Sequence, residues 1–464
     1  MRILKLTAAI ERNLLRARRE RDREAEVIAA RIIERVRRRG DTALFAYARQ
    51  FDSLDLARSG VWLSTARALA PARTKAILHR SNAARFEPAP PSPVTSDFLR
   101  AVEHAARNIR RVAEKQLPRP WTLGVEPGVA ISQRVSPIES IGCCVPGGRF
   151  ALVSTLLMTV VPAQVAGVPR ITVVCPKPKA QLLAAADFLG IPRIAQIGGA
   201  QAIAALAYGT ESIPRVDKIF GPGNRFVTAA KQLVSSDCAI DLPAGPTEAI
   251  ILASAGNPSF IAADLLAQAE HAPDAASFLV TTSPQLARAV QAEVESQLTQ
   301  LSSDNAARVS THNVGAILLA PSLAAACEFV NRFAPEHLSL PSSPGALLEK
   351  ISACGTVFLG PWAAQPLGDY ITGSNHVLPT AAWARSRGGL SSADFVKCIS
   401  TQRISQRGFL RLAGAAEPLA ESEGLLAHRR AVAIRGSALA PARHAAPRLA
   451  GAFTSAKLLR QGRR

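Results

Sequence analysis

The spacing of the apolar residues changes near residue 129 and divides the chain into two kinds of pattern. Before that point the spacing is helical: Ile28, Ile32, Ile33 and Val36 fall at i, i+4, i+5 and i+8, in a stripe that Val27 widens. Patterns of this kind predict helices over about residues 6–50, 65–82 and 95–116. We therefore expect a helical N-terminal region over residues 1–128.

Two breaks are expected within this region. Gly40 and Asp41 interrupt the first helical pattern, and Asp41 is placed to cap the helix that follows. The proline-rich segment 87–93 is a loop that ends the helix over residues 65–82. The region should therefore contain several helices.

From about Val129 onward, short aliphatic runs alternate with helical stretches. Strands are predicted over residues 171–174, 195–197, 218–220, 249–252, 278–281, 316–319 and 356–359. Helices are predicted between them, over residues 156–166, 180–189, 201–207, 225–234, 261–270 and 284–297. This alternation is typical of parallel sheets with helices on both faces, and the number of strands favours two sheets.

The predicted fold is therefore α/β, with two Rossmann-like parallel-sheet domains, a helical N-terminal region and a small helical C-terminal domain. We place the first sheet domain at residues 129–246 and the second at 247–380. The C-terminal domain follows at residues 381–435. In folds of this class, ligands bind at the carboxyl ends of the strands.

The net charge of +20 makes an anionic partner a question to settle. Arginines are dense in the first helix and in the tail from Arg429 to Arg464, which contains no Asp or Glu. Nucleic acid or an anionic surface would fit such a charge. A solvated helix face and a disordered tail over residues 436–464 explain it better, because acidic residues alternate with the arginines of the first helix. Nucleic-acid binding is therefore not expected.

The rest of the composition predicts a cytoplasmic protein. No apolar run reaches the roughly 18 residues that a membrane span requires, and the N-terminus does not resemble a signal peptide. The seven cysteines form no CxxC pair, which is typical of reduced thiols.

Glycine-rich segments follow several strand-like runs. They cover residues 146–148, 198–201, 221–224 and 244–247. Glycines let the backbone approach a ligand, and a helix N-terminus can then bind an anion such as a pyrophosphate. None of the segments is a GxGxxG fingerprint, and each taken alone is equally typical of a tight turn.

Candidate proton-transfer residues stand side by side at Glu336 and His337, directly after Pro335. Histidine titrates near neutral pH, and a partly desolvated glutamate can have a pKa close to it, so the pair is suited to moving protons. In an extended backbone the two side chains diverge and would serve different atoms. A Glu-His dipeptide by itself is more often solvated surface.

Candidate metal ligands occur in three other segments. Gln268 and His271 lie three apart on a predicted helix that ends before Pro273, although a lone histidine is more often an ordinary surface or core residue. The polar segment 368–380 contributes an aspartate and a histidine that could reach a site. Near the end of the predicted C-terminal domain, Glu423 and His428 lie five apart.

These segments resemble one known family in their order and spacing. PGGR, GGAQAIAALAYGTES, KIFGPGN, DLPAGPTE, DLLAQAEHAPD, APEHL, GDYITGSNHVLPT and the segment from Glu423 to His428 are similar to histidinol dehydrogenases, from about residue 20 to 435. The resemblance implies an enzyme that oxidises L-histidinol through L-histidinal to L-histidine with two NAD⁺, in the last steps of histidine biosynthesis. It also implies a zinc ion that anchors the substrate.

The resemblance also implies residue roles. The zinc ligands would be Gln268, His271, Asp369 and His428, which would also lie against the substrate. His337 would take the hydroxyl proton and Glu336 would activate the water that adds to the aldehyde. Further substrate contacts would come from Thr247, His376 and Glu423.

For NAD, the resemblance implies contacts from Gln201 and Asn224. Many family members have a tyrosine before the V/I-P-G-G turn where this chain has Cys144, and the loss of an aromatic contact would weaken cofactor binding by roughly 1 kcal/mol. The family also implies a homodimer in which the C-terminal segment crosses to the partner. Glu423 and His428 would then complete the other subunit's site.

Two alternatives remain at this stage. One is a dehydrogenase of the same family that oxidises another small alcohol, such as a sulfonated diol. The other is a nucleic-acid-binding protein built on an inactive enzyme scaffold. The GDYITGSNH motif favours histidinol, and the complete set of candidate site residues argues against an inactive scaffold.

Overall fold

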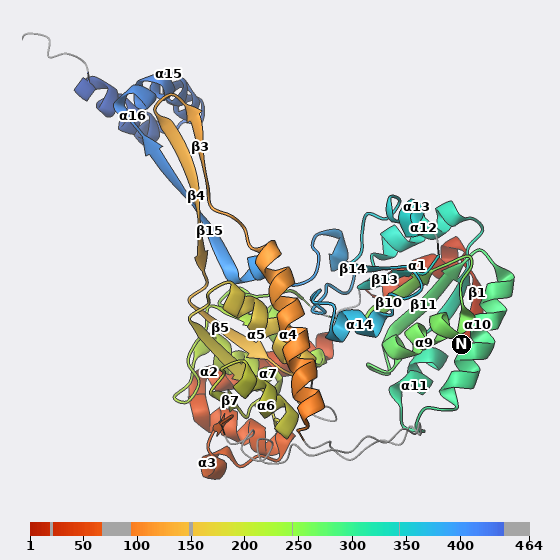
Figure 1. The fold of residues 1–464 in the computed structure, drawn as a ribbon. Helices are drawn as coiled ribbons and strands as arrows, with labels where there is room; N and C mark the ends of the chain where they lie inside the picture. The colour runs from red at the N-terminus through yellow and green to blue at the C-terminus, as the bar shows by residue number, and fades with distance from the viewer. Residues whose placement is uncertain (19–21, 67–93, 148–151, 244, 343, 440–464) are drawn as a thin grey trace, which may run out of the picture. The chain divides into compact units, whose positions relative to one another are not determined.

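The computed structural model describes residues 1–18, 22–66, 94–147, 152–243, 245–342 and 344–439 (Figure 1). The chain forms two compact units. Unit 1 combines Met1–Pro118 with Ser136–Lys397, and unit 2 combines Arg119–Val135 with Cys398–Arg464. Both candidate sites that are built below lie in unit 1.

The N-terminal region of unit 1 is helical, as predicted. Its helices are α1 (Ala8–Ala17), α2 (Arg23–Asp52), α3 (Leu56–Ser59) and α4 (Ser96–Gln116). The side chains of Thr7, Asp22 and Thr95 cap α1, α2 and α4 by accepting hydrogen bonds from backbone N–H groups of the first turn. The helix expected over residues 65–82 falls almost entirely outside the described residues.

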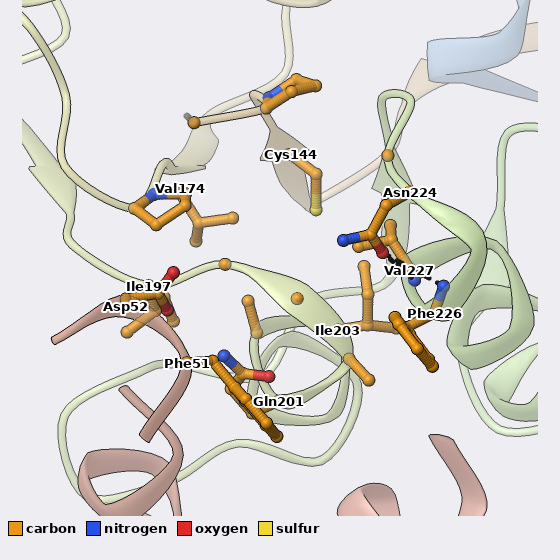
Figure 2. Close-up of a pocket in the computed structure, with 18 of the residues that line it drawn as sticks. Phe51, Asp52, Cys144, Val174, Ile197, Gln201, Ile203, Asn224, Phe226 and Val227 are labelled. Atoms are coloured by element: carbon orange, nitrogen blue, oxygen red, sulfur yellow. Dashed lines mark hydrogen bonds between the residues drawn. The ribbon is translucent and has the colours of Figure 1, made fainter. Parts of the chain in front are cut away.

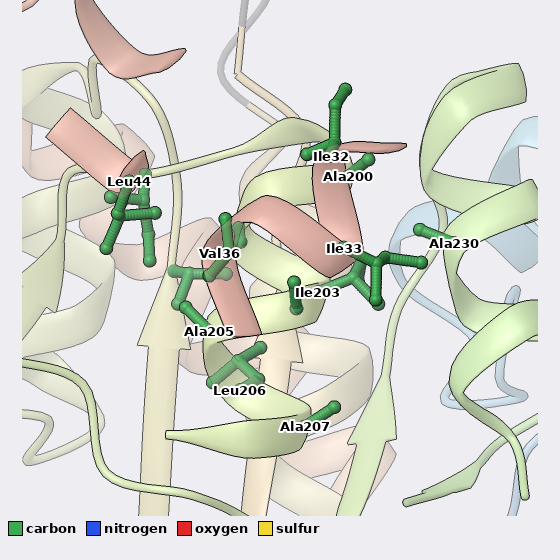
Figure 3. Close-up of a cluster of buried hydrophobic side chains, with 14 of the residues drawn as sticks. Ile32, Ile33, Val36, Leu44, Ala200, Ile203, Ala205, Leu206, Ala207 and Ala230 are labelled. Atoms are coloured by element: carbon green, nitrogen blue, oxygen red, sulfur yellow. The ribbon is translucent and has the colours of Figure 1, made fainter. Parts of the chain in front are cut away.

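The apolar stripe of α2 packs against α7 in a core that Figure 3 shows. Ile32, Ile33 and Val36 are buried, and Ile28 is partly buried. Val27 does not widen the stripe, because it is 51% exposed. The predicted break occurs at Gly40, which has non-helical angles (φ 49°, ψ −132°) inside α2. Asp41 does not cap the next turn; its carboxylate accepts a hydrogen bond from Ser212 Oγ instead.

The first sheet has six strands in the order β2-β7-β6-β5-β8-β9. They are β2 (Trp62–Ser64), β5 (Ser140–Cys144), β6 (Arg170–Val174), β7 (Arg193–Ala195), β8 (Lys218–Phe220) and β9 (Ala239–Ile240). All neighbours are parallel except β2 and β7. The connecting helices are α5 (Val153–Val165), α6 (Ala180–Phe188), α7 (Gly199–Tyr208) and α8 (Arg225–Val234). The strand order reverses between β5 and β8, which makes this the point where a ligand is expected.

The second sheet also has six strands, in the order β1-β12-β11-β10-β13-β14. They are β1 (Arg2–Lys5), β10 (Glu248–Leu252), β11 (Ala276–Thr281), β12 (Ala316–Leu319), β13 (His337–Leu340) and β14 (Thr356–Leu359). All pairs are parallel. Its helices are α9 (Pro258–Ala269), α10 (Pro284–Leu298), α11 (Ala306–Asn313), α12 (Leu323–Phe333), α13 (Pro344–Leu348) and α14 (Gln365–Tyr370). Two separate apolar cores form from the side chains of this sheet and its helices.

The fold class is therefore confirmed, with corrections to particular elements. The sequence pattern missed β1 and β2, by which the N-terminal region contributes a strand to each sheet. Strands this short contain too few residues to show a period, and their pairing depends on partners far along the chain. The pattern also missed β5, β9 and β13, and it placed the start of β7 two residues too late.

Unit 2 contains an antiparallel hairpin of β3 (Trp121–Glu126) and β4 (Val129–Pro137), joined by β15 (Val396–Ile404) in the order β15-β4-β3. Helices α15 (Gln406–Ser422) and α16 (Leu426–Leu439) follow β15 (Figure 1). Gly408 in α15 lies so close to Gly128 in the hairpin turn that a Cβ atom would collide with the Gly128 carbonyl oxygen. The start of α15 therefore packs directly on the hairpin.

The C-terminal region is less helical than expected. Residues 381–435 contain two short 3₁₀ helices and the strand β15 before α15 begins. The strand forms because β4 offers an edge to pair with, which a local pattern does not show. Residues 436–439 of the predicted disordered tail belong to α16, and the remainder of the tail lies outside the described residues. No helix in the described part of the chain is long and apolar enough to cross a membrane.

Candidate active site

The pair Glu336-His337 lies where α12 ends and β13 begins. Pro335 follows Ala334, which ends α12 in the left-handed conformation (φ 51°), and His337 starts the strand. Glu336 and His337 are only 7% and 4% exposed. Both are therefore removed from bulk water, which is unusual for charged residues and favours a functional role.

One oxygen of Glu336 organises the surrounding polar groups. Its Oε2 accepts hydrogen bonds from Thr247 Oγ1 (2.5 Å) and from the Glu248 backbone N–H (2.9 Å). Thr247 Oγ1 in turn accepts from Gln268 Nε2 (2.6 Å), and Gln268 Oε1 accepts from Gln365 Nε2. Three residues of the expected site, Thr247, Gln268 and Glu336, thus belong to one hydrogen-bonded chain.

His337 faces two carboxylates without forming a hydrogen bond to either. Its Nε2 is 3.6 Å from Asp369 Oδ1, and its Nδ1 is 3.7 Å from Glu336 Oε2. Both ring nitrogens are buried and have no hydrogen-bond partner among the described residues. Burial alone lowers the pKa of His337, but the charges of Glu336 and Asp369 outweigh this effect and raise its pKa. The imidazole is thus a strengthened base with both nitrogens free.

Asp369 and His376 lie beside this imidazole. Burial acts to raise the pKa of Asp369, but His337, His376 and His271 together lower it, so the carboxylate is ionised near neutral pH. His376 Nδ1 is 2.9 Å from the Asp369 carbonyl oxygen. Burial lowers the pKa of His376, which keeps this imidazole neutral. The structure therefore brings Asp369, His376 and His337 together as the sequence suggested.

The expected zinc ligands are only partly brought together. His271 follows α9, and its Nδ1 is 3.0 Å from the Ala267 carbonyl oxygen, so Nδ1–H donates and Nε2 keeps its lone pair. Its electrostatic effect on Asp369 shows that the two are close. His428 and Glu423 belong to unit 2, where both are exposed. Within the described ranges, no group of three or more His, Cys, Asp or Glu side chains could hold a metal.

A cavity of about 490 Å³ lies in the first sheet domain (Figure 2). It is lined by residues that follow the carboxyl ends of β5, β6, β7 and β8, where the fold class predicts a ligand. All three residues expected to contact a cofactor line it: Cys144 ends β5, Gln201 lies in the first turn of α7, and Asn224 caps α8. Asn224 Oδ1 accepts from the Phe226 and Val227 N–H groups (both 3.1 Å), which leaves its Nδ2 for a ligand.

A buried ion pair supports the loop that carries Asn224. Lys231 and Asp241 form the pair, with side chains 3% and 0% exposed. Lys231 Nζ donates to the Gly221 carbonyl oxygen (2.9 Å), and the Gly221 N–H donates to Asp241 Oδ2 (2.8 Å). The ion pair therefore binds both the N–H and the carbonyl group of Gly221, the first residue of the loop over residues 221–224.

Several site residues have no strong sequence signal. Gln365, which orients Gln268, precedes a proline in a short helix, and nothing local marks it. Arg18 binds the carboxylate of Glu248 and lies 3.7 Å over the Phe333 ring. Burial raises the pKa of Glu248 to about 7 although Arg18 opposes the shift. Glu248 stands in the DLPAGPTE motif, so the motif marked the position but not its contacts.

A cavity at the carboxyl ends of parallel strands, with a buried carboxylate–imidazole pair in the same unit, is typical of nucleotide-dependent oxidoreductases of the α/β class. The family is shown by comparison with known proteins. Residues 15–436 match the model of the family described as histidinol dehydrogenase, and the chain belongs to this family of NAD-dependent enzymes.

Individual relatives agree with the family match. A histidinol dehydrogenase of Aquifex aeolicus is 42% identical over 416 residues, which cover 89% of this chain and 93% of the relative. One from Halalkalibacterium halodurans is 43% identical over 411 residues, or 87% of this chain and 92% of the relative. The crystal structure of the histidinol dehydrogenase from Elizabethkingia anophelis superimposes with a TM-score of 0.83 at 34% identity, covering 95% of this chain and 98% of that chain. These names do not favour an enzyme for another alcohol.

Proposed function

We propose that this chain oxidises L-histidinol through L-histidinal to L-histidine and reduces two NAD⁺. The observation that carries the proposal is the buried Glu336–His337 pair, joined through Thr247 to Gln268 in a chain 42% identical to a histidinol dehydrogenase. An alcohol-to-acid oxidation needs a base twice, once for the hydroxyl proton and once for the water that adds to the aldehyde. The pair supplies two such groups.

His337 takes the hydroxyl proton. Its raised pKa makes the neutral imidazole a stronger base, and its unpartnered ring nitrogens are free to meet the substrate. Asp369, held ionised, stabilises the imidazolium that forms. Glu336 activates water in the second step, because the hydrogen bonds of the described residues engage Oε2 and leave Oε1 available.

NAD fits the cavity of the first sheet domain. Gln201 and Asn224 present amide groups to it. The N-terminus of α7, which has no side-chain cap, opens onto it, so the pyrophosphate would meet unpaired backbone N–H groups there. Cys144 offers a buried thiol where an aromatic ring would make a larger contact. When bound, NAD⁺ accepts the hydride that leaves the substrate carbon.

The donor set in unit 1 also fits zinc, although it is incomplete alone. Asp369 is ionised, His271 keeps Nε2 available, and Gln268 provides an amide oxygen. The fourth donor would be His428 of the partner subunit. Zinc has no redox chemistry, and it would anchor the substrate by binding the nitrogen atoms of the substrate. His376 and the partner's Glu423 would contact the same substrate.

A homodimer would supply those partner residues. Unit 2 exposes apolar side chains that a monomer has no evident reason to expose, including Leu419 (66%) and Leu426 (68%) near Glu423 and His428. Exposed apolar residues that gather on one element favour a protein interface. We therefore propose that α15 and α16 pack on a second copy of the chain.

The experiment that tests the function is turnover of the purified protein with zinc, NAD⁺ and L-histidinol. We expect two NADH for each L-histidinol consumed and L-histidine as the product. A sulfonated diol serves as the competing substrate. Preferred oxidation of the diol, or a stoichiometry of one NADH with histidinal as the final product, would refute the proposal.

The zinc assignment has its own test. His271→Ala should lose most of the bound zinc and the activity while the protein stays folded, because an incomplete ligand set loses most of its metal affinity. Metal analysis of the purified variant and circular dichroism give the two measurements. His312→Ala, which changes an exposed histidine in α11, is the matched control and should keep its zinc. An inactive His271→Ala protein with normal zinc content would disprove the ligand assignment.

A further inference from the structure

The proposed cofactor cavity contains an acidic side chain to which neither the family match nor the mechanism above gives a role. Asp52, the last residue of α2, is the one acidic residue among the described residues that line the cavity. Its Oδ2 atom is buried and accepts no hydrogen bond from the described residues. Burial also raises the pKa of this carboxyl. A buried carboxylate oxygen without a donor is costly, so a ligand that brings a donor would be favoured there.

Asp52 lies at one end of the cavity and Asn224 at the other. Figure 2 shows Asp52 beside Ile197 and near Val174, on the opposite side from Asn224. Val174 ends β6, and Ile197 follows β7. The side chain therefore lies beyond the carboxyl ends of β6 and β7.

The position of this carboxylate matches a need of the fold. In doubly wound sheets the dinucleotide crosses the point where the strand order reverses, and an acid beyond the second strand binds the hydroxyls of the adenosine ribose. Here the order reverses between β5 and β8, and β6 is the second strand of the domain. The residues that follow β6 are Cys175, Pro176 and Lys177, none of which is acidic. Asp52 brings the missing carboxylate from another element.

The connections of the chain indicate which end of the cavity holds the reacting ring. Gly221 opens the loop that carries Asn224, and its N–H binds Asp241. Asp241 precedes Thr247 by six positions in the sequence, and the Thr247 hydroxyl binds Glu336. The nicotinamide should therefore lie at the Asn224 end, and the adenosine at the Asp52 end.

We propose that Asp52 accepts hydrogen bonds from the hydroxyls of the adenosine ribose and thereby selects NAD over NADP. This rests on the proposed function in that the cavity is taken to hold the dinucleotide. NADP would replace a hydroxyl donor by a phosphate whose negative charge faces the carboxylate, which is repulsive. Lys177, whose charge acts on Asp52, would attract that phosphate once the carboxylate is removed.

The test is calorimetric binding of NAD and of NADP to the full-length protein and its variants. Asp52→Asn and Asp52→Ser should weaken NAD binding and shift the ratio of the two dissociation constants toward NADP by roughly tenfold to a hundredfold, the effect of one charged hydrogen bond. Asp55→Asn is the matched control, because Asp55 lies three residues further on, pairs with Arg49 on the surface and is absent from the cavity lining. It should bind both dinucleotides as the wild type does.

A second measurement needs no variant. The wild-type protein should bind an NAD analogue with a 2′-deoxyadenosine roughly tenfold more weakly than NAD, because one donor to Asp52 is missing. An unchanged NAD:NADP ratio in the folded Asp52 variants, or equal affinity for NAD and its 2′-deoxy analogue, would overturn the assignment while leaving the proposed function intact. Failure of the wild-type protein to bind NAD at all would overturn the proposed function and this inference with it.

Discussion

At the residue scale, the two catalytic candidates differ in how the protein holds them. Glu336 is fixed by two donors to the same oxygen, Thr247 Oγ1 and the Glu248 N–H, whereas the His337 ring has no hydrogen bond among the described residues. A carboxylate held in this way is oriented for one task, while an imidazole whose ring nitrogens have no hydrogen-bond partner among the described residues keeps a lone pair for a substrate proton. This difference supports a division of labour between the two residues.

The first prediction tests that division. Glu336→Gln should keep much of the alcohol oxidation but slow the aldehyde oxidation by roughly 10²–10⁴-fold, the usual effect of a lost general base. His337→Asn should also damage the alcohol step, because no other group is proposed to take the hydroxyl proton. NADH formation from L-histidinol and from L-histidinal, measured separately for each variant, gives the comparison. Equal losses on both substrates for Glu336→Gln would mean that the two residues share one role.

The residues that the sequence could predict are those whose neighbours along the chain form a motif. Glu336 and His337 are adjacent, so local chemistry marked them. Gln201 and Asn224 stand in glycine-rich segments, but their proposed contact with the cofactor came from the family resemblance. Gln365, Arg18 and Asp52 reach their sites through contacts with distant segments, which no local spacing shows. The zinc ligands were suggested by the family resemblance, and their assembly stays a prediction.

At the scale of elements, the two proposed sites lie at opposite ends of the strands of their sheets. The proposed cofactor cavity lies at the carboxyl ends of the strands of the first sheet, as expected for the fold class. Glu336 and His337 instead lie at the amino end of β13, where His337 pairs with Ala249 near the start of β10. The sequence pattern did not predict this, because β13 itself was missed. The rule for ligand position therefore agrees with the proposed cofactor cavity and not with the proposed catalytic pair.

Close approach of elements explains why a glycine stands at position 221. Its φ is +109°, and a Cβ atom would collide with the Cys144 carbonyl oxygen at the end of β5. Gly221→Ala should displace the loop over residues 221–224, lower the free energy of unfolding and raise the Kd for NAD roughly tenfold or more. Gly209→Ala is the control: it has φ +79° but its nearest contact would be an ordinary 3.4 Å. It should lose roughly 1–3 kcal/mol of stability and keep NAD affinity.

The joint between α9 and α14 should make stability depend on pH. Asp264 accepts a hydrogen bond from the Gln365 backbone N–H, and burial raises the pKa of Asp264 to about 6. Because the pKa is about 3.9 in the unfolded chain, the folded state binds the proton more tightly, so stability from this group is present at low pH and lost as pH rises through 6. The loss should be about 2 kcal/mol between pH 4.5 and 7.5.

Denaturant unfolding of Asp264→Asn at both pH values measures this effect. Asparagine keeps an acceptor for the Gln365 N–H but cannot ionise, so the variant should gain stability relative to the wild type as pH rises. Asp97→Asn, at a side chain that is 83% exposed, should show nearly the same difference from wild type at both pH values. A difference for Asp264→Asn that is independent of pH would show that the carboxyl is already ionised at pH 4.5.

At the scale of the whole molecule, periodicity predicted the two parallel sheets and most of their helices. It could not predict how strands from distant segments join, as with β1 and β2, because pairing is decided by tertiary contacts. Nor could it predict the second compact unit, which combines residues 119–135 with residues from 398 onward. Periodicity could not predict the proposed shared site either, because that site needs residues from a second copy of the chain.

The last prediction tests that sharing by complementation. Glu336→Gln and His428→Ala should each abolish most of the overall activity. If each active site combines Glu336 of one subunit with His428 of the partner subunit, a heterodimer of the two variants has one doubly defective site and one intact site. Equal amounts unfolded and refolded together should therefore recover about one quarter of wild-type activity, because half of the dimers are mixed and half of their sites are intact.

Mixing Glu336→Gln with His337→Asn is the matched control and should recover nothing, since both changes fall on the same side of every site. Recovery of no activity in the first mixture, with heterodimers shown to be present by differently tagged subunits, would place His428 in the site of its own chain.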